Sequence, residues 1–147
     1  MVALHVMTLE NYAVLGKIVY AWADLRSDIF TETFTLIGVD RNVARIATIN
    51  MGDVDHYVDA LYRVAESKAL NPTLLEQIDS FGEELEELQY RKDEFLNRSI
   101  DLSLPFPTPE CEEIALLIRS LIEQFADLSE ALREEWYEPA NLAPPAL

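Results

Sequence analysis

The spacing of apolar residues near the N-terminus is the feature that most constrains the fold of this chain. Over residues 9–37 they recur every three or four positions, at Leu15, Ile18, Val19, Trp22, Leu25, Ile29, Phe30, Phe34 and Ile37. This spacing forms one broad stripe along a long α-helix. The chain has only 4 glycines among 147 residues, which leaves little material for hairpin turns. The sequence therefore predicts an all-α fold.

Glycine and aspartate residues mark where the first helix should end. Gly38 suits the left-handed position just past a helix, and Asp40 can cap a shorter run over residues 43–51. Gly52 predicts a kink or break before the next apolar run, over residues 54–65. The connections between these segments are short.

Prolines mark the remaining boundaries. The pair Asn71 and Pro72 is typical of an N-cap followed by the first helical residue, and Thr108 and Pro109 repeat this signal before the last helix. Three prolines in the last ten residues predict that residues 138–147 are extended or disordered.

The number and length of these segments predict one domain. Four long helical segments, one of them broken, favour an antiparallel bundle of four to five helices over residues 1–137. A chain of 147 residues with 50% apolar content can fill one core of ordinary size.

The charge of the chain limits its partners. With 27 acidic and 11 basic residues, the formal net charge is -16, which opposes binding to the phosphates of a nucleic acid. An acidic surface suits a basic protein instead. No apolar stretch approaches the roughly 20 residues of a membrane span, and no signal peptide is visible, so we expect a cytoplasmic protein without a membrane partner.

Residues that commonly carry chemistry are few. His5 and His56 have no second histidine or cysteine at helical spacing, so no metal site is predicted. The single cysteine, Cys111, cannot form an internal disulfide, and the adjacent Glu110 and Glu112 oppose a reactive thiolate. No phosphate-binding glycine loop or nucleophile motif is present, and we expect no cofactor.

The aromatic residues of the first helix fit its core stripe better than a cofactor pocket; these are Trp22, Phe30 and Phe34. Three others suit either a partner-facing surface or the margin of the core: Tyr20, Trp136 and Tyr137.

Three segments carry a family resemblance: LGKIVYAWADLRSDIFTETFTLIGVD, RIATINMGDVDHYVDALYRVAESKAL and LLEQIDSFGEELEELQYRKDEFLNRSID. They resemble a group of bacterial helical proteins related to the HEPN superfamily. In that group the first helix carries a glycine and, six residues later, a tryptophan, here Gly16 and Trp22. The third helix ends in Arg-Asn or Arg-Lys, followed after a few residues by histidine. The resemblance covers about residues 15–101 and implies a HEPN-like bundle.

In active members of the superfamily this arginine and histidine act on RNA without a metal, often across a dimer interface. The resemblance assigns the first two motif positions to Arg91 and Lys92. When four, five or six residues are counted after Arg91, the next residue is Leu96, Asn97 or Arg98, so the histidine is missing. Leucine cannot transfer a proton and asparagine can only form hydrogen bonds. The resemblance therefore implies a domain that has lost catalytic competence.

Helical spacing gives these residues structural roles as well. Lys92 lies three residues before Phe95, so its stem should pack on the apolar stripe while its ammonium finds a carboxylate or the surface. Arg91 lies at the margin of the stripe and is expected to pair with Glu87 or Glu94.

The predicted function is protein association rather than catalysis. We expect a homodimer formed by parts of the first and third helices, an acidic partner for a basic protein such as a toxin or nuclease, or both. The alternative is a metal-independent ribonuclease whose proton-transfer group is displaced or supplied by a partner. A third interpretation is a helical module that binds a small ligand, but no residue in the sequence specifically supports it.

Overall fold

The computed structural model describes residues 6–36, 38, 54–99, 101 and 105–136. Within these ranges the chain forms four helices, which are α1 (Leu9–Leu36), α3 (Val54–Ser67), α4 (Pro72–Ser99) and α5 (Thr108–Trp136). The predicted all-α bundle is confirmed. The signals at Asp40 and Gly52, the run over 43–51 and the tail at 138–147 lie outside the described residues.

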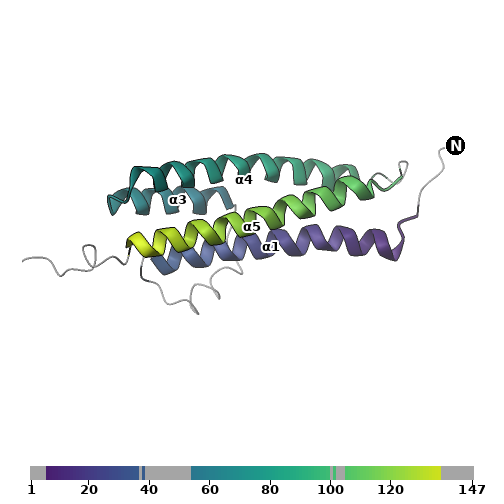
Figure 1. Cartoon of the computed structure of the whole chain (residues 1–147). Coiled ribbons are helices and arrows are strands. Elements are labelled where there is room, and N and C mark those ends of the chain that lie inside the picture. Colours follow the sequence, from purple (N-terminus) through teal and green to yellow (C-terminus); the bar gives the residue numbers. More distant parts are fainter. Residues whose placement is uncertain (1–5, 37, 39–53, 100, 102–104, 137–147) are drawn as a thin grey trace, which may run out of the picture.

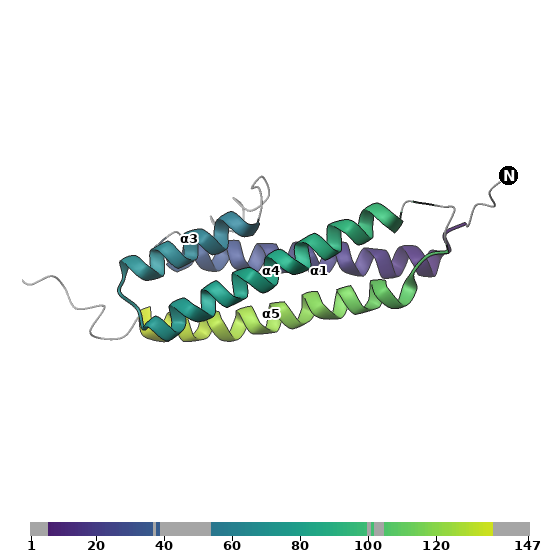
Figure 2. The ribbon, with the colours of Figure 1, turned by 90° about the horizontal axis from the view of Figure 1, so that it is seen from above.

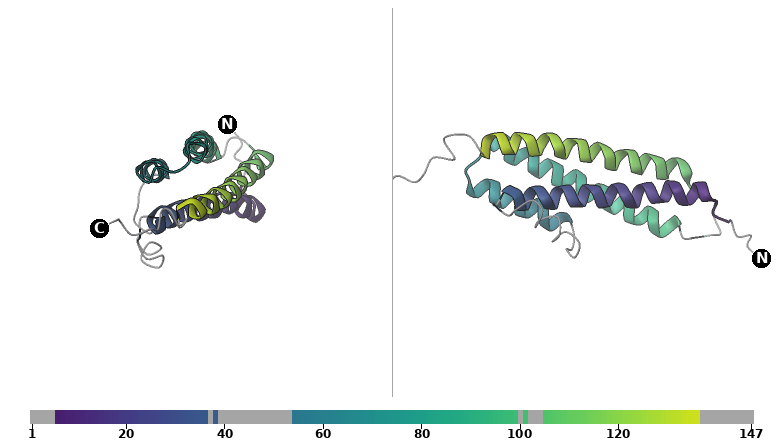
Figure 3. Two further views of the ribbon diagram at one scale, coloured as in Figure 1. Left: turned by 60° about the vertical axis from the view of Figure 1, so that its left-hand side comes forward. Right: turned by 90° about the horizontal axis from the view of Figure 1, so that it is seen from below.

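The four helices form an elongated bundle (Figure 1). Each packs against two neighbours, in the ring α1, α3, α4, α5. The helices joined by short connections, α3 with α4 and α4 with α5, run antiparallel (Figure 2). In contrast, α1 runs in the same direction as α5, and Figure 3 shows their N-terminal ends side by side.

Two of the predicted helix boundaries follow from local hydrogen bonds. Just past α1, Gly38 has a positive φ of 95°, and its N–H donates to the carbonyl oxygen of Thr35 at 3.1 Å. At the start of α4, the side-chain oxygen of Asn71 accepts a 2.9 Å hydrogen bond from the N–H of Thr73. Both predictions are confirmed, because a left-handed glycine and an asparagine cap satisfy backbone groups that a helix end leaves free.

The start of α5 differs by one residue from the prediction. The N–H of Cys111 donates to the carbonyl oxygen of Pro107 at 3.1 Å, so the first helical hydrogen bond already begins at Pro107. Thr108 is therefore the first residue of the helix rather than its cap, and Pro109 is the second. Proline is tolerated there because the first-turn N–H groups have no helical acceptor.

The core agrees with the predicted stripes except at two positions. Ile18, Leu25 and Ile29 of α1 are fully buried. Val19, however, is 58% exposed. Leu117, which helical spacing from Ile114 and Leu121 predicts to lie on the apolar stripe of α5, is 38% exposed. Val19 lies on the N-terminal half of α1, beyond the reach of the shorter α3 (Figure 1).

A partly buried ion pair, which the sequence did not predict, joins the C-terminal halves of α1 and α5. The side chain of Glu32 is only 4% exposed, and Arg133 contacts both of its oxygens, at 2.6 and 2.9 Å. This two-point contact fixes the axial register of α5 relative to the parallel α1. A glutamate without a partner at this depth would be strongly unfavourable.

We predict that Arg133→Met lowers the free energy of unfolding by about 2 kcal/mol, because it leaves the Glu32 carboxylate buried without its cation. Arg133 is itself half exposed, which keeps the effect below that of a fully buried pair. Urea unfolding of this variant and of the exposed-residue control Arg119→Met measures the difference. The double variant Glu32→Met/Arg133→Met should recover part of the loss. Equal stability of Arg133→Met and Arg119→Met would contradict this role.

Candidate functional site

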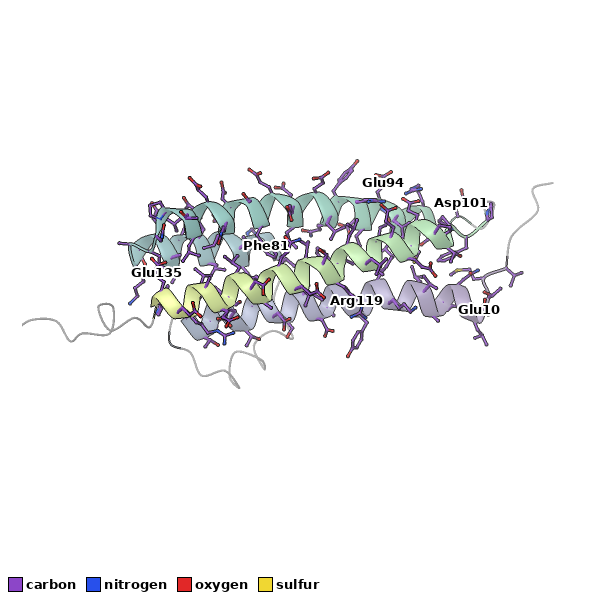
Figure 4. The ribbon with its side chains drawn as sticks, viewed as in Figure 1. Glu10, Phe81, Glu94, Asp101, Arg119 and Glu135 are labelled. Carbon is purple, nitrogen blue, oxygen red and sulfur yellow. The ribbon has the colours of Figure 1, made fainter. Side chains whose placement is uncertain are left out.

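The arginine of the degenerate motif is held by the neighbouring helix. Arg91 lies on α4, and its Nη2 is 3.0 Å from Oε2 of Glu113 on α5. The predicted pairing with Glu87 or Glu94 is therefore wrong. Glu94 points away from the bundle (Figure 4), whereas Arg91 lies on the side of α4 that faces α5.

The second cation of the motif is nearly buried. The Lys92 side chain is 12% exposed, and its Nζ lies 4.3 Å from the centre of the Trp22 ring on α1. The same nitrogen is 3.0 Å from Oδ1 of Asp93. The stem packs on the apolar stripe as predicted, and the ammonium is held between an aromatic face and a carboxylate.

No imidazole occupies the third motif position. Leu96 is partly buried against the core, and Asn97 is exposed. His56, on α3, is the one histidine in the described part of the chain, and its side chain is exposed. Helix α3 packs beside the first half of α4, where its Val58 lies against Gly82, nine residues before Arg91. His5 lies outside the described residues.

A third cation near the end of α4 was not assigned a partner from the sequence. Arg98 contacts both carboxylate oxygens of Glu110 on α5, at 2.6 and 3.3 Å, and lies 3.8 Å from Glu94. The hydrogen bonds to Glu110 raise the pKa of Arg98 above its ordinary value. All three cations of this region are therefore already in contact with carboxylates, which an RNA phosphate would have to displace.

The only cysteine is protected from reaction. Cys111 is fully buried under the first turn of α5. Burial, followed by the charges of Glu112 and Glu110, raises the pKa of its thiol to about 11, and Lys17 opposes this shift. This supports the prediction of an inert thiol, because the thiolate is the reactive form.

A groove runs between α4 and α5, which we call the α4–α5 groove. It consists of two hollows of about 610 and 340 Å³ that share Glu84 and Gln124. Its floor is apolar and consists of Phe81, Leu88, Leu121 and Leu128. Phe81 points from α4 toward α5 (Figure 4), where its ring lies 5.4 Å from that of Phe125.

Four carboxylates form the rim of this groove: Glu76, Glu84, Glu87 and Asp127. None of them forms an ion pair with a basic residue in the described ranges, although several other acidic residues do. From Thr73 to Arg91 the groove follows α4 over 18 residues, about 27 Å at 1.5 Å per residue. These four carboxylates are therefore not neutralised by ion pairs, and Arg91, which is paired with Glu113, is the one basic residue among those that line the groove.

Another acidic hollow, of about 430 Å³, lies between α3 and α4, where Asp59 on its edge is paired with Arg63. Among the described residues, no three histidine, cysteine or acidic side chains come together as metal ligands. None of the four helices described is both apolar and long enough to serve as a bilayer span.

The three aromatic residues considered for a partner-facing surface differ from one another. Tyr20 is 67% exposed and remains a candidate. Trp136 is buried, and Nζ of Lys68 lies 5.2 Å from the centre of its ring, so its assignment to the core margin is the correct one. Tyr137 lies outside the described residues.

Comparison of the chain with protein-family models, curated proteins and solved structures finds no match. The HEPN-like resemblance accordingly stays a prediction.

We predict that Cys111 reacts with a disulfide reagent much more slowly in the folded protein than in urea, because its thiol is buried and protonated. The pKa of the thiol rises from 9.0 in the unfolded chain to about 11 in the folded protein. Stability from this group is therefore complete below pH 9 and is lost as pH rises toward 11. Urea denaturation of wild type and Cys111→Ala between pH 9 and pH 11 measures this loss of stability. Fast labelling of the native protein at neutral pH would contradict the assignment.

Proposed function

We propose that this chain is a non-catalytic helical domain that binds a basic protein partner through the α4–α5 groove. The observation that carries the proposal is the rim of carboxylates without ion-pair partners around an apolar floor. The net charge of -16 supports it, because such a chain attracts basic partners over a long range.

The state of the motif residues supports a non-catalytic role. A metal-independent ribonuclease needs a cation free to stabilise phosphate charge and a group that exchanges a proton near neutral pH. Arg91 and Lys92 are engaged by Glu113 and Asp93, and the third position offers Leu96 or Asn97. The HEPN-like resemblance is then that of a domain that keeps the bundle without the chemistry.

The shape and charge of the groove define the partner that fits it. A channel of about 27 Å accepts an amphipathic helix of about five turns. Apolar side chains along one face would contact the floor at Phe81 and Leu88, and lysines or arginines at the edges would meet Glu84 and Asp127. A toxin or nuclease with an exposed basic helix is a partner of this kind.

We predict that a fluorescently labelled, helical peptide with leucines on one face and lysines on both edges binds the protein, as measured by fluorescence anisotropy. The variant Glu84→Lys/Glu87→Lys should bind at least about tenfold more weakly, a loss of about 1.4 kcal/mol, because two attractive charges become repulsive. The control Glu123→Lys/Glu130→Lys has the same net charge but changes exposed residues of α5 that do not line the groove.

Equal weakening in the groove and control variants would show that the peptide recognises total charge and would contradict the proposed site. A scrambled peptide of the same composition tests the apolar floor in the same way, because it keeps the lysines and loses the continuous leucine face.

For the ribonuclease alternative, we predict that wild type and Arg91→Ala leave a broad RNA pool equally intact in the presence of a metal chelator. Gel electrophoresis of the pool measures this. Cleavage by wild type that leaves a cyclic phosphate and disappears in Arg91→Ala would establish the alternative instead.

A further inference from the structure

The N-terminal half of α1 exposes an apolar face, which we call the α1 stripe. It consists of Leu9, Tyr12, Ala13, Gly16, Val19, Tyr20 and Ala23. Leu9 is 88% exposed, and Tyr12, Val19 and Tyr20 are each more than half exposed. Helix α3 packs on the other half of α1, where Tyr57 contacts the Phe30 ring, and at 14 residues it does not extend along the stripe (Figure 1).

The middle of the α1 stripe allows close approach of another helix. Ala13 and Gly16 lie along it between the larger Leu9 and Tyr20, and Tyr12 and Val19 lie beside them. A methyl group built on Gly16 would meet nothing within 4 Å, so this glycine is not needed for packing inside the bundle. Small central residues flanked by large ones let two helices cross closely and interdigitate.

The charges beside the stripe match a second copy of the same helix. Glu10 and Lys17 are seven residues apart and therefore lie along the same edge. Neither forms an ion pair within the described ranges. When two copies of α1 meet antiparallel, with a twofold axis near residues 13 and 14, Glu10 of each copy faces Lys17 of the other. In a parallel pair in register, the edges that carry Glu10 and Lys17 would lie on opposite sides of the interface, so these residues would not meet.

We propose that the α1 stripe is a self-association surface, on which two copies of this chain pack antiparallel through α1 and form two reciprocal Glu10–Lys17 pairs. This goes beyond the proposed function, because the stripe and the α4–α5 groove share no residue. It also narrows the expected dimer interface, from parts of the first and third helices to the first helix alone.

The charge distribution favours a second copy over the basic partner at this surface. Basic partners are attracted by uncompensated carboxylates, whereas Lys17 repels them and pairs with Glu10 of a second copy. Elsewhere the chain carries a large excess of negative charge, so two copies repel each other across most other faces. The stripe combines exposed apolar area with one acidic and one basic residue that a second copy can pair.

Sedimentation velocity of the full chain over a wide range of concentrations tests the proposal. We expect a monomer–dimer equilibrium, with the dimer weakened at least about tenfold in Tyr20→Glu. Leu116→Glu is the matched control, because Leu116 is an equally exposed apolar residue on α5 outside the stripe. Circular dichroism verifies that each variant stays helical.

A charge swap tests the antiparallel geometry. Lys17→Glu places two pairs of like charges in each dimer and should weaken it, and Glu10→Lys/Lys17→Glu should restore association by reversing both pairs. A monomer at every concentration would overturn the proposal, as would equal effects of Tyr20→Glu and Leu116→Glu. A dimer in which the double variant is no stronger than Lys17→Glu would overturn the antiparallel pairing. Peptide binding by Tyr20→Glu reports on the α4–α5 groove separately.

Discussion

The short length of α3 is the constraint on which the rest of this structure depends. It spans 14 residues beside partners of 28 and 29 residues, so it covers only part of the bundle. Where it is present, α1 is enclosed from two sides, and five consecutive residues from Ile29 to Thr33 are buried. Where it is absent, the same helix shows apolar residues to solvent. The enclosed half therefore needs internal partners for its polar groups, and Glu32 finds Arg133 while Thr33 donates its hydroxyl proton to the carbonyl oxygen of Ile29.

The C-terminal end of α4 and the N-terminal end of α5 are joined by ion pairs as well as by the packing of buried apolar residues such as Phe95 and Ile114. Arg91 and Arg98 lie two turns apart on α4 and contact Glu113 and Glu110 on α5. These contacts link the two helices on either side of their connecting turn. Because these side chains are partly exposed, each pair contributes little to stability by itself, and the pairs chiefly align the two helices.

The sequence predicted features that depend on one helix and missed those that depend on its neighbours. Helical periodicity was enough to locate the four described helices, the caps at Gly38 and Asn71, and the packing of the Lys92 stem. The partner of Arg91 was predicted within α4 because only residues of the same helix have a known spacing. The pair Glu32–Arg133 spans 101 positions and follows from α1 and α5 being parallel, which no local pattern encodes. Val19 was assigned to the core because periodicity does not show where a neighbouring helix ends.

The net charge of -16 gives the two proposed surfaces opposite responses to ionic strength. Salt screens charges beyond about 10 Å at 0.1 M. Screening weakens the attraction between the carboxylate rim of the α4–α5 groove and a basic helix. It also weakens the long-range repulsion between two acidic chains that approach through the α1 stripe, together with the attraction of the two Glu10–Lys17 pairs, and it leaves the apolar contact unaffected. For the two proposed contacts, dilute buffers would favour the complex with a basic protein, and concentrated ones would let two identical chains approach more closely. Because the two surfaces share no residue, both contacts can form on one chain.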